Sequence, residues 1–406
     1  MASKLQNLAN RAEGIATHAK SLAMTTIPAP YARARFPTLA NATYLVSHSM
    51  SAPPRETRDV LDAYWSAWSE NGPEAWETWL PQIAEIADGL GRLVGAAPGT
   101  VSLVPNVSLA QAAIASALAF TPERDGVVIE ALQFPTVTYV WKAWEKYGAR
   151  IVTVPSGDGR TMSTDRICSA IDERTAVVAL SHAAYASGSL IDVAAIQARC
   201  RETGAIFVLD TYQTTGVVPT DVAALDLDVL VGGSHKWLCG GPGCGFLYVR
   251  PGLRDRLAPA ITGWMAHAEP FAFEPAPIAL ATGAHRYNTG TPTVVGYLVA
   301  RVGHAIVEEI GIANVRAHNA RLTERLVTGA QARGFSIPTP LDPAARTGWI
   351  GMDFPGAERA TAALVARRVF VDYRPGCGIR VGPHFYSSDD DIDAYFAAVD
   401  DVRRTL

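Results

Sequence analysis

The sequence predicts an α/β fold in which helices flank a mostly parallel sheet, followed by a smaller α+β domain at the C-terminus. From about residue 100, short runs rich in valine and isoleucine alternate with helix-like stretches. Such runs, when Gly, Pro or Asp bounds them, are typical of strands buried on both faces. After about residue 259 the sequence becomes irregular and rich in Pro and aromatic residues. The chain has 406 residues and is 49% hydrophobic, which is enough for a large core and more than one domain.

Strands and helices are expected in regular alternation over residues 100–250. The helix-like stretches lie at 107–120, 136–148 and 192–204. The strand-like runs lie at 100–105, 126–132, 150–155, 176–183, 205–210, 227–233 and 245–250. Because helices separate most of these strands, we expect parallel pairing between them.

The remaining sequence indicates a three-part organisation. A long helical run reaches about residue 334, and the strand-like "GWIGMDF" and two further helix-like stretches follow. We therefore predict a large domain over 44–314 and a small α+β domain over 315–406. Residues 1–43 are expected to pack on the small domain, and their first 23 residues have the polar and apolar alternation of a short amphipathic helix.

Composition narrows the class of partner. With 35 basic and 39 acidic residues, the chain has a formal charge of -4 and lacks the positive excess that nucleic acid or an acidic membrane attracts. The sequence also lacks a continuous apolar run long enough for a membrane span or a signal peptide. We expect a cytoplasmic protein that acts on a small molecule, with no nucleic-acid or membrane partner.

The five cysteines are scattered, which favours a reducing compartment over a disulfide framework. Cys239 and Cys244 are close in sequence, but no second cysteine or histidine pair follows at the spacing of zinc ligands. We expect small core residues at these positions and no metal site.

Two charged residues at strand ends suggest a specific cofactor. Ligands of open parallel sheets bind at the carboxyl ends of the strands. Asp210 ends one predicted strand, and Lys236 follows the next one between two glycine-rich turns. Taken alone, each residue is equally consistent with an ordinary turn after a strand. Together they supply what pyridoxal phosphate requires, an amine for a Schiff base and a carboxylate that keeps the ring nitrogen protonated.

Two neighbouring strand ends offer partners for the rest of that cofactor. Ser108 lies in the first turn of a helix that follows a strand, where free N–H groups and the helix dipole attract phosphate. Phe134 follows the next strand, where the face of its ring is placed to cover the pyridine ring of the cofactor. An ordinary N-cap and a core phenylalanine are the alternatives. The glycines of "GGSHKWLCGGPGCG" are expected to let the backbone approach the cofactor.

Competing catalytic motifs do not match. The segment "GGSHK" has Lys236 where the hydrolase motif G-x-S-x-G needs glycine, and no G-x-x-x-x-G-K-[ST] loop is present.

From residue 44 to the C-terminus, the sequence resembles the class V branch of the pyridoxal-phosphate enzymes with the aspartate-aminotransferase fold. The segment from Asp210 to Lys236 is most similar to kynureninase-like proteins. The resemblance implies that Lys236 carries the cofactor, that Asp210 pairs with the ring nitrogen and that Arg380 binds the substrate α-carboxylate. Without the resemblance, a surface ion pair between Arg380 and one of the aspartates at 389–391 is the alternative. It implies cofactor contacts for Val107, Ser108, Phe134, Ser181, Gln213 and His235, and contacts from a neighbouring subunit of a homodimer for Trp264 and Thr291.

The sequence does not decide which reaction of this family the protein catalyses. Gln213 and His235 replace a histidine and a tyrosine of kynureninases, so the resemblance supports either a kynureninase-like hydrolytic lyase or an aminotransferase. A cysteine desulfurase, an epimerase and a binding module without catalysis are the alternatives, and Cys377 lies near Arg380. We expect burial in the core or in a dimer contact, and not binding of an aromatic substrate, for the four tryptophans Trp65, Trp68, Trp76 and Trp79.

Overall fold

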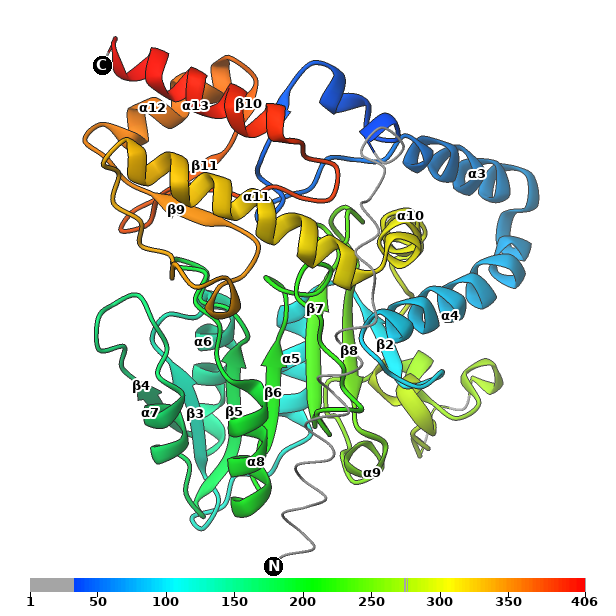
Figure 1. Ribbon diagram of the computed structural model, residues 1–406. Coiled ribbons are helices and arrows are strands. Elements are labelled where there is room, and N and C mark those ends of the chain that lie inside the picture. Colours follow the sequence, from blue (N-terminus) through cyan, green and yellow to red (C-terminus); the bar gives the residue numbers. More distant parts are fainter. Residues whose placement is uncertain (1–32, 274, 276, 406) are drawn as a thin grey trace, which may run out of the picture.

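A seven-stranded sheet forms the centre of the computed structural model, which describes residues 33–273, 275 and 277–405 (Figure 1). The strand order is β2-β8-β7-β6-β5-β3-β4, and β8 alone runs antiparallel to its neighbours. The strands are β2 (Val101–Val104), β3 (Gly126–Glu130), β4 (Arg150–Val154), β5 (Thr175–Ser181), β6 (Ile206–Asp210), β7 (Val229–Gly233) and β8 (Gly245–Val249). The predicted α/β fold with a mostly parallel sheet is confirmed.

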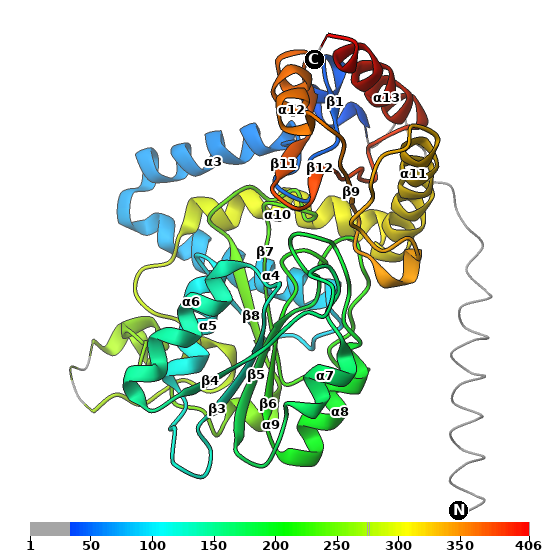
Figure 2. The ribbon, with the colours of Figure 1, turned by 90° about the vertical axis from the view of Figure 1, so that its left-hand side faces the viewer.

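Helices cover both faces of this sheet (Figure 2). Successive side chains of β6 point to opposite faces of the sheet. Val208 packs with the cluster that contains α5 and α6. Phe207 and Leu209 pack with the cluster that contains α4, α8 and α10. The helices of this part are α3 (Glu56–Asn71), α4 (Trp76–Leu93), α5 (Val107–Ser116), α6 (Pro135–Lys142), α7 (Thr164–Ser169), α8 (Val193–Thr203), α9 (Pro251–Arg254) and α10 (Val294–Ile310).

The C-terminal elements build a second core above the sheet in Figure 1. A three-stranded sheet of order β11-β12-β9 packs with the last helices. These elements are α11 (Ile312–Ala332), β9 (Ile350–Met352), α12 (Ala357–Ala366), β10 (Val369–Phe370), β11 (Asp372–Arg374), β12 (Gly378–Val381) and α13 (Asp389–Arg403). The predicted boundary after residue 314 falls in the first turn of α11, and the domain limits remain predictions.

The described part of the N-terminal segment contacts this smaller unit. Strand β1 (Thr43–Tyr44) pairs in parallel with β10, and Arg33 forms an ion pair of 2.6 Å with Asp391 at the start of α13. The amphipathic helix predicted over the first 23 residues lies outside the described residues. No described helix has both the length and the apolar character that crossing a membrane demands.

The four tryptophans that were expected in the core or in a dimer contact lie on two helices. Trp79 on α4 is buried and Trp76 is half-buried, whereas Trp65 and Trp68 on α3 are 65% and 54% exposed. Burial in the core of one chain therefore applies to the α4 pair and not to the α3 pair.

The glycines of β7 make room for aromatic rings of the same chain. A Cβ on Gly232 would lie 2.3 Å from the ring of Phe246, and a Cβ on Gly233 would lie 2.2 Å from the ring of Tyr212. The space beside Gly233 lets the Tyr212 ring lie near Lys236, whose ammonium is 4.7 Å from the ring centre. The expectation that these glycines let the backbone approach the cofactor remains a prediction.

Candidate active site

Most of the predicted site residues line one pocket of about 350 Å³ at the carboxyl ends of the strands. Parallel pairing brings Ser181, at the end of β5, directly beside Asp210, at the end of β6. The pocket includes the predicted residues Val107, Ser108, Phe134, Ser181, Asp210, Gln213, His235, Lys236 and Arg380. The residues that sequence reasoning missed are His48, Ser49, Asn106, Thr136, Ala183, Tyr185, Tyr212 and Arg374.

Lys236 and Asp210 have opposite pKa shifts that share one cause. Burial lowers the pKa of Lys236 to about 8, although the charge of Asp210 opposes the shift. Burial raises the pKa of Asp210 to about 6, although a hydrogen bond from the Tyr212 amide and the charge of Lys236 oppose it. The Lys236 ammonium lies 4.7 Å from the ring centre of Tyr212 and 5.8 Å from that of Phe134. A lysine in these surroundings has a larger fraction of free amine at neutral pH than an exposed lysine.

Asp210 is oriented by a short chain of hydrogen bonds. Its Oδ1 accepts from the Tyr212 amide at 2.9 Å, and its Oδ2 accepts from Gln111 Nε2 at 3.3 Å. Gln111 in turn accepts a hydrogen bond of 2.7 Å from Trp141 Nε1. Gln111 lies one turn after Ser108 on α5, and this spacing was the sequence signal that could have found it.

The N-terminus of α5 opens onto the pocket. Asn106 is its N-cap, and its side chain accepts from the Leu109 amide at 3.1 Å. The amides of Val107 and Ser108 belong to the first helical turn, whose N–H groups have no partner within the helix. With the helix dipole, these groups favour a bound phosphate. The N-cap is therefore Asn106, and the alternative that Ser108 is an ordinary N-cap is wrong.

His235 and Gln213 each bring a polar group to the pocket. His235 Nδ1 lies 2.8 Å from the Tyr212 hydroxyl, and burial lowers the pKa of His235 to about 4. Its ring is neutral at pH 7, so it serves as a hydrogen-bond partner without positive charge. Oε1 of Gln213 is buried and has no partner among the described residues. A buried acceptor of this kind calls for a donor from a bound molecule.

Arg380 is buried and its position is fixed by the chain itself. Nε and Nη2 bind the two carboxylate oxygens of Asp372 at 2.8 and 2.5 Å, and Nη1 donates to the Tyr185 carbonyl at 2.8 Å. Asp372 and Arg380 are cross-strand partners on β11 and β12. The alternative of a surface ion pair with residues 389–391 is wrong.

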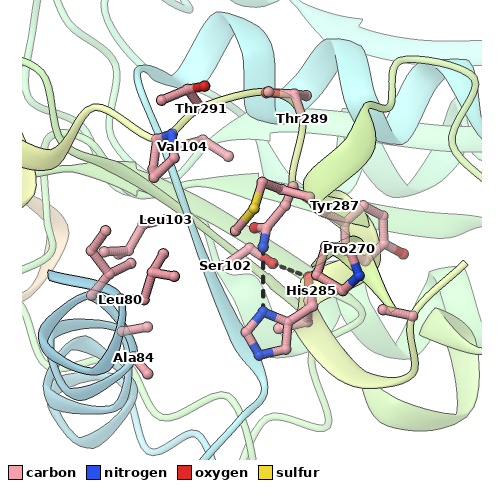
Figure 3. A pocket seen from close by; sticks show the side chains of 18 of the residues that line it. Leu80, Ala84, Ser102, Leu103, Val104, Pro270, His285, Tyr287, Thr289 and Thr291 are labelled. Carbon is pink, nitrogen blue, oxygen red and sulfur yellow. Dashed lines mark hydrogen bonds between the residues drawn. The ribbon is translucent and has the colours of Figure 1, made fainter. Parts of the chain in front are cut away.

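Trp264 and Thr291 do not line this pocket. Thr291 borders a separate cavity of about 570 Å³ between α4, β2 and residues 261–293 (Figure 3). Trp264 is 40% exposed and lies 5.9 Å from the ring of Phe273. Their predicted role concerns a neighbouring subunit, and it remains a prediction because a single chain is described.

The groups around the pocket fit pyridoxal phosphate. The pocket brings together a lysine of lowered pKa, a buried carboxylate, an open helix N-terminus and the unpartnered Gln213 side chain. By contrast, the described residues contain no group of three or more His, Cys, Asp or Glu side chains placed to hold a metal ion.

The sequence of the whole chain matches proteins of one family. The family model "Aminotransferase class-V" matches residues 43–388. An uncharacterized aminotransferase of Bacillus subtilis (strain 168), YcbU, is 30% identical over 373 residues, which cover 91% of this chain and 96% of YcbU. A kynureninase of Pseudomonas fluorescens is 27% identical over 363 residues, which cover 84% of this chain and 83% of that protein.

The fold of the chain also matches solved structures. A cysteine desulfurase from Thermococcus onnurineus NA1 superposes with a TM-score of 0.83 at 20% identity, and the match covers 94% of this chain and 99% of that chain. At this level of identity the match shows a shared fold and carries no information about the reaction.

Proposed function

The chain belongs to the aminotransferase class-V family, and from this premise we propose that it is a pyridoxal-phosphate enzyme that reacts α-amino acids at the α-carbon. The observation that carries the proposal is the placement of Lys236 and Asp210 in one pocket, with the pKa of the lysine lowered to about 8. When bound, the cofactor supplies an electron-accepting ring that stabilises negative charge at the substrate α-carbon.

The residues of the chain then have distinct tasks. Lys236 would hold the cofactor covalently through its amine, and its Nζ would take the α-proton of the substrate. Asp210 would hold a proton on the ring nitrogen, and Gln111 and Tyr212 keep its carboxylate in place. Val107 and Ser108 would bind the phosphate through their amides, and Phe134 would lie beside the ring.

We place transamination first among the reactions because it requires no catalytic group beyond Lys236 and Asp210. Hydrolytic cleavage of a kynurenine-like substrate is the second candidate, supported by the kynureninase relatives and by the unpartnered Gln213 oxygen in the pocket. Desulfuration through Cys377 is disfavoured, because its side chain is fully buried and burial raises the pKa of the thiol to about 12. A homodimer in the cytoplasm remains part of the proposal.

Turnover of a panel of amino acids separates these reactions. We expect the holoenzyme to convert at least one amino acid to its keto acid only when a keto-acid acceptor is present. Release of alanine from kynurenine without an acceptor would instead assign the hydrolytic reaction. A protein that gains no visible cofactor absorption with added pyridoxal phosphate would contradict both.

The lowered pKa of Lys236 predicts how cofactor uptake depends on pH. The free amine reacts with an aldehyde and the ammonium does not, so uptake by the apoprotein should accelerate as the pH rises and level off above about 8. Stopped-flow absorbance of the apoprotein mixed with pyridoxal phosphate measures this profile. A midpoint near 10, the range of an exposed lysine, would show that burial does not activate Lys236.

A further inference from the structure

The guanidinium of Arg380 keeps part of its binding capacity free. A guanidinium carries one N–H on Nε and two on each Nη. Asp372 takes the Nε group and one Nη2 group, and the Tyr185 carbonyl takes one Nη1 group. One N–H therefore remains on each Nη atom. These two donors equal in number the two oxygens of a carboxylate.

The positive charge of Arg380 is balanced by a neighbouring carboxylate. Asp372 neutralises Arg380, and its own pKa lies well below the usual range because hydrogen bonds from His48 and Arg380 outweigh its burial. His48 Nε2 lies 3.0 Å from Asp372 Oδ1, but burial and the charge of Arg380 lower the pKa of His48 to about 4. The group formed by His48, Asp372 and Arg380 thus has no net charge at pH 7. A substrate carboxylate that binds there needs a further cation.

Arg374 is the cation in position to provide that charge. It ends β11, two residues after Asp372, and lines the same pocket as Arg380 and Lys236. Its Nη2 lies 3.1 Å from Asp372 Oδ2, the oxygen that also binds Arg380, and its Nη1 donates to the Tyr373 carbonyl at 2.7 Å. Both guanidinium groups therefore flank one carboxylate oxygen. The side chain of Arg374 is 43% exposed, so it has room to move toward a ligand.

The charges of this cluster match a single carboxylate. Two arginines and one aspartate leave one net positive charge beside neutral histidines. Of the other ionised groups that line the pocket, Lys236 and Asp210 are engaged by the cofactor in the proposed function. Arg374 is also among the charges that lower the pKa of Lys236, after burial and Arg380, which indicates that it acts on the interior of the pocket.

We propose that Arg374 is a second substrate-binding residue, which contacts the α-carboxylate together with Arg380, and that Asp372 is the positioning residue that orients both arginines. This inference rests on the proposed function, because it assigns the recognition of the amino-acid substrate. It names the substrate class as α-amino acids with a free carboxylate, which the site should prefer over amines and carboxamides of the same skeleton.

Steady-state kinetics of the holoenzyme with Arg374→Gln test the proposal. The substrate is the amino acid turned over fastest in the panel, and the probe is its carboxamide. We expect the variant to raise KM about 10- to 100-fold, the effect of one charge-assisted hydrogen bond, and to change kcat by less than about threefold. The preference for the acid over the carboxamide should fall by a similar factor, and Arg374→Lys should recover part of it.

A matched control separates this role from a loss of surface charge. Arg367 is also 43% exposed and also pairs with an aspartate, Asp401, outside the pocket. Arg367→Gln should therefore leave KM and the acid preference unchanged. An unchanged KM in Arg374→Gln, or equal effects on acid and carboxamide, would overturn the inference while wild-type turnover upholds the proposed function. Wild-type protein that turns over no amino acid would overturn the proposed function and this inference with it.

Discussion

Replacing Lys236 with alanine is expected to abolish turnover and covalent attachment of the cofactor. Lys236 is the amine of the pocket, and the proposed mechanism also uses it as the base toward the α-proton. Loss of a positioned base alone lowers rates by roughly 10²- to 10⁴-fold, and loss of the covalent bond adds to this. The assays are turnover with the best amino acid of the panel and the visible absorption of the purified protein.

Lys146→Ala is the matched control for that experiment. Lys146 is exposed, its ammonium lies 4.9 Å from the ring centre of its neighbour Tyr147, and it does not line the pocket, so its loss should change neither activity nor absorption. A Lys236→Ala protein that keeps both the visible band and turnover would show that another amine holds the cofactor. Far-UV circular dichroism and the melting temperature establish whether each variant remains folded.

The cofactor site could be predicted from sequence because its residues lie at strand ends. Parallel pairing brings all such ends to one edge, so Ser181, Asp210 and Lys236 meet there once the strands are identified. The order of strands and helices along the chain is enough to place these residues together, without knowledge of side-chain contacts. The same logic located Phe134 and the first turn of α5.

The surroundings of Arg380 were not predicted, for a physical reason. The partners of that side chain depend on the register of a hairpin, and a shift by one residue would place Asp372 on the other face. The wrong alternative, a pair with residues 389–391, followed from closeness in sequence alone. Likewise, the relay from Trp141 through Gln111 depends on how α5 and α6 are rotated about their axes.

The glycines around Lys236 illustrate a different limit. The sequence indicates that a side chain is excluded, but it does not name the neighbour that excludes it. In β7 that neighbour is an aromatic ring of the chain, Phe246 or Tyr212. For Trp264 and Thr291, the predicted partner is a second chain, so neither the sequence nor the fold of one chain decides their role.

Replacing Asp210 with asparagine should lower kcat by roughly 10²- to 10³-fold, because the amide keeps the shape of the side chain but loses the charge that stabilises a protonated ring nitrogen. Asp210 also raises the pKa of Lys236, so its loss should shift the pH profile of cofactor uptake to lower pH. Glu130→Gln is the control, since Glu130 is another buried carboxyl at a strand end and burial raises its pKa to about 8. That side chain is outside the residues that line the pocket, so kcat should stay within about threefold. Full activity of Asp210→Asn, or a shift of the uptake profile to higher pH, would contradict the role given to this carboxylate.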